Sequence, residues 1–89
     1  MRESTIETKV CSYARSKGWL TYKFVSPSNR GVPDRIWLKS GKAVFVEFKA
    51  TGKEPTKLQV KVMKRIQEQD FEVYVVDNVE QGIDLVDRL

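Results

Sequence analysis

Glu47 and Lys49 are the first residues whose types and spacing could support catalysis. They are separated by one residue within Ala43–Lys49, an alternating apolar run that predicts a strand. Side chains two residues apart on a strand leave the same face of the sheet. Two charges on one face of a central strand are unfavourable unless a metal ion, a neighbouring charge or an exposed strand end compensates. The structural alternative is that both residues simply reach water where the strand ends.

Asp34 is predicted to lie beside this pair. It begins the segment Asp34–Lys39, and the chain reverses at Ser40–Lys42, so a hairpin places the start of one strand beside the end of the next. Two neighbouring carboxylates raise each other's pKa, and a divalent cation relieves their repulsion. Mg²⁺ prefers one or two carboxylates together with water and phosphate oxygens. The pattern therefore predicts a magnesium-type site, whereas the alternative for Asp34 is a turn residue that follows a proline.

Two further polar residues lie on predicted helix faces that point toward the sheet. Glu7 borders the apolar stripe of the first helix and is a third candidate acid. Gln59 shares a face of the second helix with Met63 and Ile66, where it needs hydrogen-bond partners and could orient a metal-bound water or an acid. The alternatives are a capping box between Ser4 and Glu7, and for Gln59 a satisfied polar residue at a helix start.

The chain is basic, with 16 Lys and Arg against 12 Asp and Glu and a net charge of +4. This balance favours polyanionic partners such as DNA or RNA, although it also suits simple solubility. The better candidates for phosphate contact lie on or beside the strands and loops that carry the acids. These candidate DNA-binding residues are Lys23, Ser26, Arg30, Arg35 and Lys53. The cations on the outer face of the second helix are expected only to be solvated: Lys57, Lys61, Lys64 and Arg65.

Histidine is absent and Cys11 is the only cysteine. These two facts exclude a Ser-His-Asp triad, a histidine general base, a histidine- or cysteine-ligated zinc site and a disulfide framework. With 89 residues, 40% hydrophobic and 31% charged, the chain is expected to form one soluble domain over residues 1–89. It shows neither a membrane-spanning run nor the apolar segment of a signal peptide, so we expect an intracellular location, cytoplasmic or inside a host cell.

The apolar periodicity predicts the element order helix, three strands, helix, strand, helix. The expected helices are Ser4–Gly18, Thr56–Asp70 and Val79–Leu89, and the expected strands are Trp19–Val25, Asp34–Lys39, Ala43–Lys49 and Phe71–Val76. Short connections favour antiparallel pairing of the first three strands. The return through a helix favours a parallel, right-handed crossover for the fourth. The predicted fold class is therefore α/β, a four-stranded mixed sheet flanked by helices.

With these elements in place, three segments resemble the virus-type replication-repair nuclease (VRR-NUC) family of the PD-(D/E)XK nuclease superfamily. They are Gly31-Val32-Pro33-Asp34, the strand Phe45-Val46-Glu47-Phe48-Lys49, and the downstream Gln59. The order αβββαβ(α) also matches the restriction-endonuclease-like core of that superfamily. The resemblance implies that Asp34 and Glu47 bind metal, that Lys49 is the catalytic lysine, and that Glu7 and Gln59 match the helix-one acid and the helix-two glutamine.

The activity that this resemblance implies is metal-dependent hydrolysis of DNA by an endonuclease that uses Mg²⁺ or Mn²⁺. Short stand-alone members of the family resemble homodimers that cut branched DNA such as four-way (Holliday) junctions. The aromatic residues of the first two strands also favour a dimer, because so small a core does not readily cover all of them: Trp19, Tyr22, Phe24 and Trp37. The alternatives are a catalytically silent nucleic-acid-binding module of the same fold and an interaction domain without a nucleic-acid partner.

Overall fold

The computed structural model describes all 89 residues, and its elements follow the predicted order. The helices are α1 (Glu3–Ser16), α2 (Lys57–Glu68) and α3 (Val79–Arg88), and the strands are β1 (Leu20–Lys23), β2 (Arg35–Lys39), β3 (Lys42–Phe48) and β4 (Glu72–Val76). The strands form one sheet in the order β1-β2-β3-β4. The β1/β2 and β2/β3 pairs are antiparallel and the β3/β4 pair is parallel. This arrangement confirms the predicted α/β class and mixed sheet.

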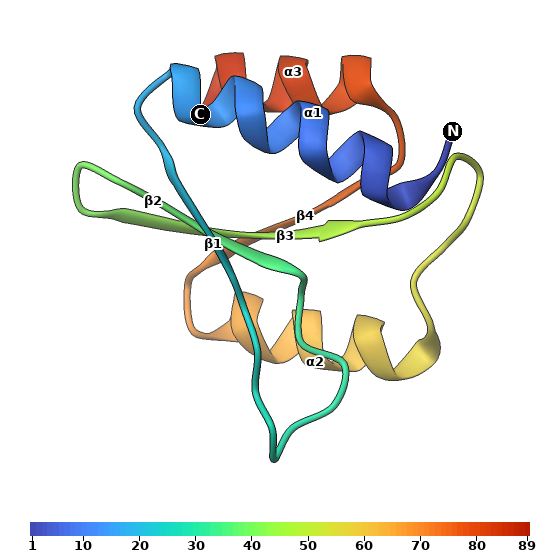
Figure 1. Ribbon diagram of the computed structural model, residues 1–89. Coiled ribbons are helices and arrows are strands. Elements are labelled where there is room, and N and C mark those ends of the chain that lie inside the picture. Colours follow the sequence, from blue (N-terminus) through green and yellow to red (C-terminus); the bar gives the residue numbers. More distant parts are fainter.

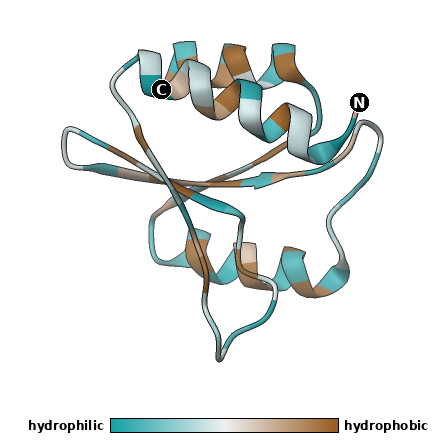
Figure 2. Ribbon diagram, viewed as in Figure 1, coloured by the Kyte–Doolittle hydropathy of each residue, from teal (hydrophilic) through white to brown (hydrophobic).

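Helices cover both faces of the sheet (Figure 1). α1 and α3 lie side by side on one face, and α2 lies on the opposite face. Gly82 of α3 permits the close approach to α1, because a Cβ atom at this position would lie 2.4 Å from Cγ2 of Val10. Each helix mixes hydrophobic and hydrophilic residues (Figure 2), as expected for helices with one buried face. None of the three has the length and apolar character needed to cross a bilayer.

The main core lies between the sheet and the α1/α3 layer. α1 contributes apolar residues one helical turn apart, and β3 contributes every second residue, so both periodicities point into the same space. The buried residues that result are Ile6, Val10, Ala14, Val44, Val46 and Phe48. The apolar side chains of β3 point to the α1/α3 layer, so the alternate residues point to the opposite face, where α2 lies. Glu47 and Lys49 are among these alternate residues.

Trp19 and Trp37 belong to this core. Trp37 is fully buried, Trp19 is nearly so, and their ring centroids lie 6.3 Å apart. Phe24 packs against Phe45, with centroids 5.4 Å apart, and only Tyr22 of the four aromatic residues on the first two strands is exposed. The two tryptophans therefore complete the core of the single chain, and of the four aromatics only Tyr22 remains uncovered, as was expected for some of them.

Local signals set the ends of the elements that carry the acids. Ser40 and Gly41 both have positive φ, 51° and 80°, which is the two-residue type I′ turn that joins antiparallel strands without splaying them. α1 begins at Glu3, and its N-cap residue Arg2 makes no side-chain capping bond. The predicted capping box between Ser4 and Glu7 is therefore wrong, and the carboxylate of Glu7 is directed at the sheet instead.

Candidate active site

The β2–β3 hairpin brings Asp34 and Glu47 together. Its register pairs Arg35 with Val46. Asp34 precedes Arg35 and Glu47 follows Val46, so the two acids stand opposite each other at the end of the ladder. Asp34 is held there because its Oδ2 accepts a 2.9 Å hydrogen bond from the backbone N–H of Phe48. The convergence of the two acids that the hairpin predicted is present in the structure.

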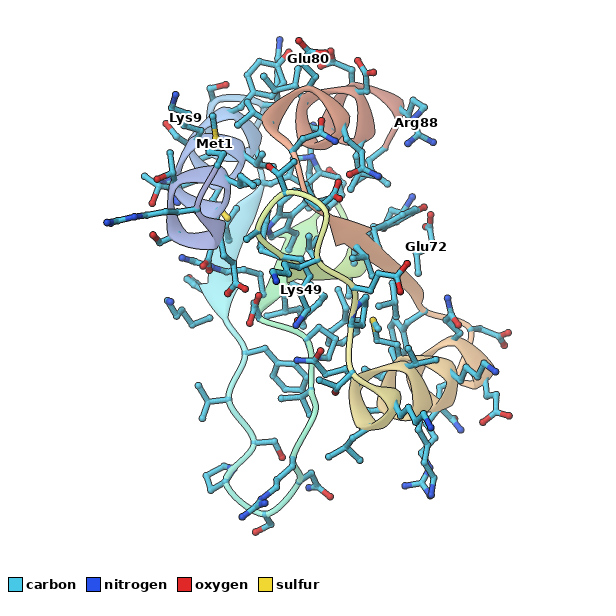
Figure 3. The ribbon with its side chains drawn as sticks, turned by 90° about the vertical axis from the view of Figure 1, so that its right-hand side faces the viewer. Met1, Lys9, Lys49, Glu72, Glu80 and Arg88 are labelled. Atoms are coloured by element: carbon cyan, nitrogen blue, oxygen red, sulfur yellow. The ribbon has the colours of Figure 1, made fainter.

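Glu47 is buried, with only 2% of its surface exposed, and its two oxygens have different surroundings. Oε2 lies 3.2 Å from Nζ of Lys49, whereas Oε1 is buried and has no hydrogen-bond partner. An unpartnered buried carboxylate oxygen is rare in folded proteins, because its desolvation is not repaid by a bond. Lys49 lies near the middle of the side of the molecule where β3 ends, between the two helical layers (Figure 3).

The electrostatics of the two acids reflect this crowding. The pKa of Glu47 is raised to about 7, first by burial and then by the charge of Asp34, although Lys49 opposes both effects. Burial also raises the pKa of Asp34, and the hydrogen bond from Phe48 opposes this change. In both residues the ionised form is therefore short of positive partners.

The residues fit a hard divalent cation. No group of three carboxylates converges closely enough to hold a metal without other ligands. Mg²⁺ does not require one, because it takes one or two carboxylates and completes its shell with water and phosphate oxygens. The pair Asp34 and Glu47, with the unpartnered Oε1 of Glu47, matches that preference.

Glu7 lies next to this pair but is engaged by cations. Its Oε2 lies 2.6 Å from Nε of Arg35 and 3.7 Å from Nζ of Lys23. Arg35 also donates a 2.8 Å hydrogen bond to the carbonyl of Thr21, and its side chain is largely buried. Arg35 therefore holds Glu7 in the structure, and its predicted DNA contact remains a prediction. The charge of Glu7 still raises the pKa of Asp34, so this acid belongs to the electrostatic environment of the site.

Glu3 is an acid near the site that sequence reasoning missed. It lies in the first turn of α1, and its pKa is raised first by partial burial and then by the charge of Asp34, whereas Lys49 lowers it. Its spacing of four residues from Glu7 was the available signal, because residues at this spacing share a helix face. Glu3 is consequently a second acid that borders the pair, on the same helix face as Glu7.

Gln59 lies at the start of α2 and forms a capping box with Thr56. The N–H of Gln59 donates to Oγ1 of Thr56, and the side-chain Oε1 of Gln59 accepts from the N–H of Thr56. This is the structural alternative of a satisfied polar residue at a helix start. Any role for Gln59 in orienting water remains a prediction.

The predicted DNA-binding residues separate by position. Lys23 is exposed at the edge of the acid cluster and lowers the pKa of Asp34. Ser26 and Arg30 line a groove between the β1–β2 loop and α2. Lys53 is exposed in the loop after β3. Lys23, Arg30 and Lys53 are all exposed and can reach a polyanion, although Lys23 also lies 3.7 Å from Glu7.

Two solved structures share this fold. One, described as "VRR_NUC domain", matches with a TM-score of 0.88 and 24% sequence identity, over 96% of this chain and 94% of that one. A second, "VRR_NUC domain protein", matches with a TM-score of 0.81 and 13% identity, over 98% of this chain and 86% of that one. The fold of this chain is therefore that of the VRR_NUC domain structures, as the sequence pattern predicted.

Sequence comparison extends the likeness from fold to family. The chain matches no family model. It is 44% identical over 79 residues to the "Putative nuclease p44" of Acyrthosiphon pisum secondary endosymbiont phage 1, which spans 88% of this chain and 85% of that protein. The chain therefore belongs to the same family as this phage protein.

Proposed function

We propose that this protein is a divalent-metal-dependent DNA endonuclease. The observation that carries the proposal is the buried carboxylate of Glu47. Its Oε1 has no hydrogen-bond partner, and a second acid, Asp34, raises its pKa. A buried acid beside a half-buried one is unfavourable, and a shared cation removes the repulsion between them. The family relationship, with a phage protein named as a nuclease, supports the same reading.

Each residue of the site has a proposed role. Asp34 and Glu47 would hold Mg²⁺ or Mn²⁺, with Glu7 as the adjacent acid. When bound, such a metal polarises a phosphate oxygen and lowers the pKa of a coordinated water. Lys49, whose Nζ lies 3.2 Å from Oε2 of Glu47, would orient the attacking hydroxide or stabilise the developing negative charge. Lys23, at the exposed edge of the cluster, is suited to contact a neighbouring phosphate.

The proposed substrate is branched DNA such as a four-way junction, and the proposed working unit is a homodimer. β1 is an edge strand that pairs only with β2, and it exposes Leu20 by 51% and Tyr22 by 57%. An exposed edge with apolar side chains is a surface on which a second copy could pack. A two-fold dimer has two sites related by symmetry, which suits a junction with its own approximate two-fold symmetry.

A panel of labelled DNA substrates tests the proposal. Duplex, flap, splayed and four-way DNA are incubated with the protein, with and without Mn²⁺, and the products are separated on denaturing gels. We expect metal-dependent cutting, with four-way DNA preferred and a sedimentation mass of twice 10.3 kDa. Binding without cutting of any substrate would instead indicate the catalytically silent binding module. Cutting of all forms at equal rates by a monomer would contradict the junction-selective dimer.

A further inference from the structure

A groove of about 790 Å³ runs between the β1–β2 loop and α2. In Figure 3 this loop and α2 extend below Lys49 on opposite sides. Apolar residues of both elements line the groove, among them Phe24, Val32 and Val62. Gly31 allows the loop to approach the helix closely, because a Cβ atom at this position would lie 3.0 Å from Cγ of Leu58. The groove is therefore a shaped feature of the fold.

The charges along the groove are unequal. Arg30 projects from the loop, and Lys61 and Arg65 project from α2, where their spacing of four residues places them on one helix face. None of these three cations forms an ion pair, whereas the only acid in the lining is Glu68. Unpaired cations over an apolar floor are complementary to a phosphodiester chain, whose phosphates are charged and whose sugars and bases are less polar.

Two residues of the groove lining lie close to the acid pair. The backbone N–H of Phe24 donates a 2.9 Å hydrogen bond to the carbonyl of Asp34, and Val32 lies two residues before that acid. Both residues line the groove. A strand lying in the groove would therefore pass near the backbone of Asp34.

We infer that this groove is a substrate subsite, which binds the phosphodiester backbone of one strand of DNA through Arg30, Lys61 and Arg65. The inference rests on the proposed function, because it assumes that the acids act on the same strand. It gives Lys61 and Arg65 a part in recognition, although the sequence pattern had assigned them to a merely solvated face. It also explains why Arg30 is unpaired while Arg35, only five residues later, is used to hold Glu7.

Two double variants of α2 test the subsite with matched charge loss. Lys61→Ala with Arg65→Ala removes two groove cations, and Lys57→Ala with Lys64→Ala removes two cations of the same helix that do not line the groove. All four residues are exposed and alanine favours helix, so thermal melts should show that both proteins fold. Fluorescence anisotropy in EDTA, with labelled single-stranded and duplex DNA at several salt concentrations, measures binding without cleavage.

We expect the groove variant to bind at least roughly fivefold more weakly and to reduce the slope of log affinity against log salt by about 1 for each lost contact. The control variant should stay within about twofold of wild type with an unchanged slope. Whichever DNA form loses more affinity identifies whether the bound strand is unpaired or part of a duplex. Equal losses in the two variants, or no loss in the groove variant, would overturn the inference.

Glu68→Gln provides a test of opposite sign, because removal of the only acid in the lining should tighten DNA binding. Unchanged or weaker binding by this variant would also count against the subsite.

Cleavage by wild type separates the two proposals. If wild type cuts DNA while the groove variant binds and cuts normally, the subsite is wrong and the nuclease stands. If the groove variant loses binding but wild type never cuts, the subsite stands and the nuclease is wrong. If wild type binds no DNA, both are wrong.

Discussion

The backbone N–H of Phe48 donates a 2.9 Å hydrogen bond to the side chain of Asp34, across the end of the β2–β3 hairpin. A main-chain donor on β3 thus holds a side chain that precedes β2, and it does so next to the buried carboxylate of Glu47. The consequence is electrostatic strain that should be measurable in the metal-free protein.

Glu47→Gln should therefore abolish cleavage and yet stabilise the metal-free protein. The pKa of Glu47 is raised in spite of Lys49, so the ionised side chain is unfavourable where it stands. Gln has nearly the same shape and no charge. At pH 8 in EDTA we expect the free energy of unfolding to increase by about 1 kcal/mol or more. For a domain of this size, each kcal/mol raises the melting temperature by roughly 4–8 °C. A lower melting temperature together with retained cleavage would contradict this account.

The stability of the metal-free wild type should fall as the pH rises from about 4.5 to about 7. The pKa of Glu47 in the folded protein is about 7, above its ordinary value of 4.5, so the folded state binds more protons than the unfolded state between these limits. The raised pKa of Asp34 acts in the same direction. Urea unfolding in EDTA at pH 5 and pH 8 measures the difference. Glu47→Gln should lose the part of the pH dependence that Glu47 causes, and an equally large dependence in that variant would contradict the assignment.

Lys49→Ala should reduce the single-turnover cleavage rate by roughly 10²-fold or more, the scale expected for a group that stabilises developing charge. DNA binding in EDTA should change little. The assay belongs at pH 9, because loss of Lys49 removes a partner that lowers the pKa of Glu47. Lys64→Ala is the matched control, since it removes an exposed lysine that belongs neither to the acid pair nor to the groove lining. If Lys49→Ala cuts as fast as this control, Lys49 has no part in the reaction.

Glu7 and Arg35 call for a double variant. Glu7→Gln alone leaves a largely buried guanidinium without its anionic partner, and breaking such a pair typically costs about 3–5 kcal/mol. Glu7→Gln with Arg35→Met removes both charges and should recover much of that stability. If Glu7 also serves the metal, the double variant should melt near wild type but still cut poorly. Recovery of cleavage along with stability would restrict Glu7 to holding Arg35.

The sequence predicted those parts of the site that depend on strand geometry. A hairpin with a short turn places Asp34 beside Glu47, and alternation along β3 turns Glu47 and Lys49 to one face. Alternation along the strand also implied that the side chain of Arg35 faces away from that of Asp34. This signal was not used, because Arg35 was grouped with the other cations by charge. Likewise, Thr56-Lys57-Leu58-Gln59 is a capping-box sequence, and it explains the position of Gln59.

The sequence was less informative wherever two layers meet. Helical periodicity shows which face of α1 is buried but not how close its first turn comes to the acids, so Glu3 was missed. The same limit applies to Trp19 and Trp37, because strand alternation does not show how much of the sheet α1 and α3 cover. The groove depends on the approach of a loop to α2, which no local pattern in either segment specifies.

Metal-dependent cutting tests the central claim most directly. Wild type and Glu47→Gln are incubated with labelled four-way DNA in EDTA and then across a titration of Mn²⁺ and Mg²⁺, and the initial rate of strand cleavage is measured. We predict no cutting in EDTA, cutting by wild type that rises with metal and saturates, and none by folded Glu47→Gln at any metal concentration. Undiminished cutting by wild type in EDTA, or cutting by Glu47→Gln at the wild-type rate, would contradict the assignment of Asp34 and Glu47 as the metal-binding acids of a nuclease.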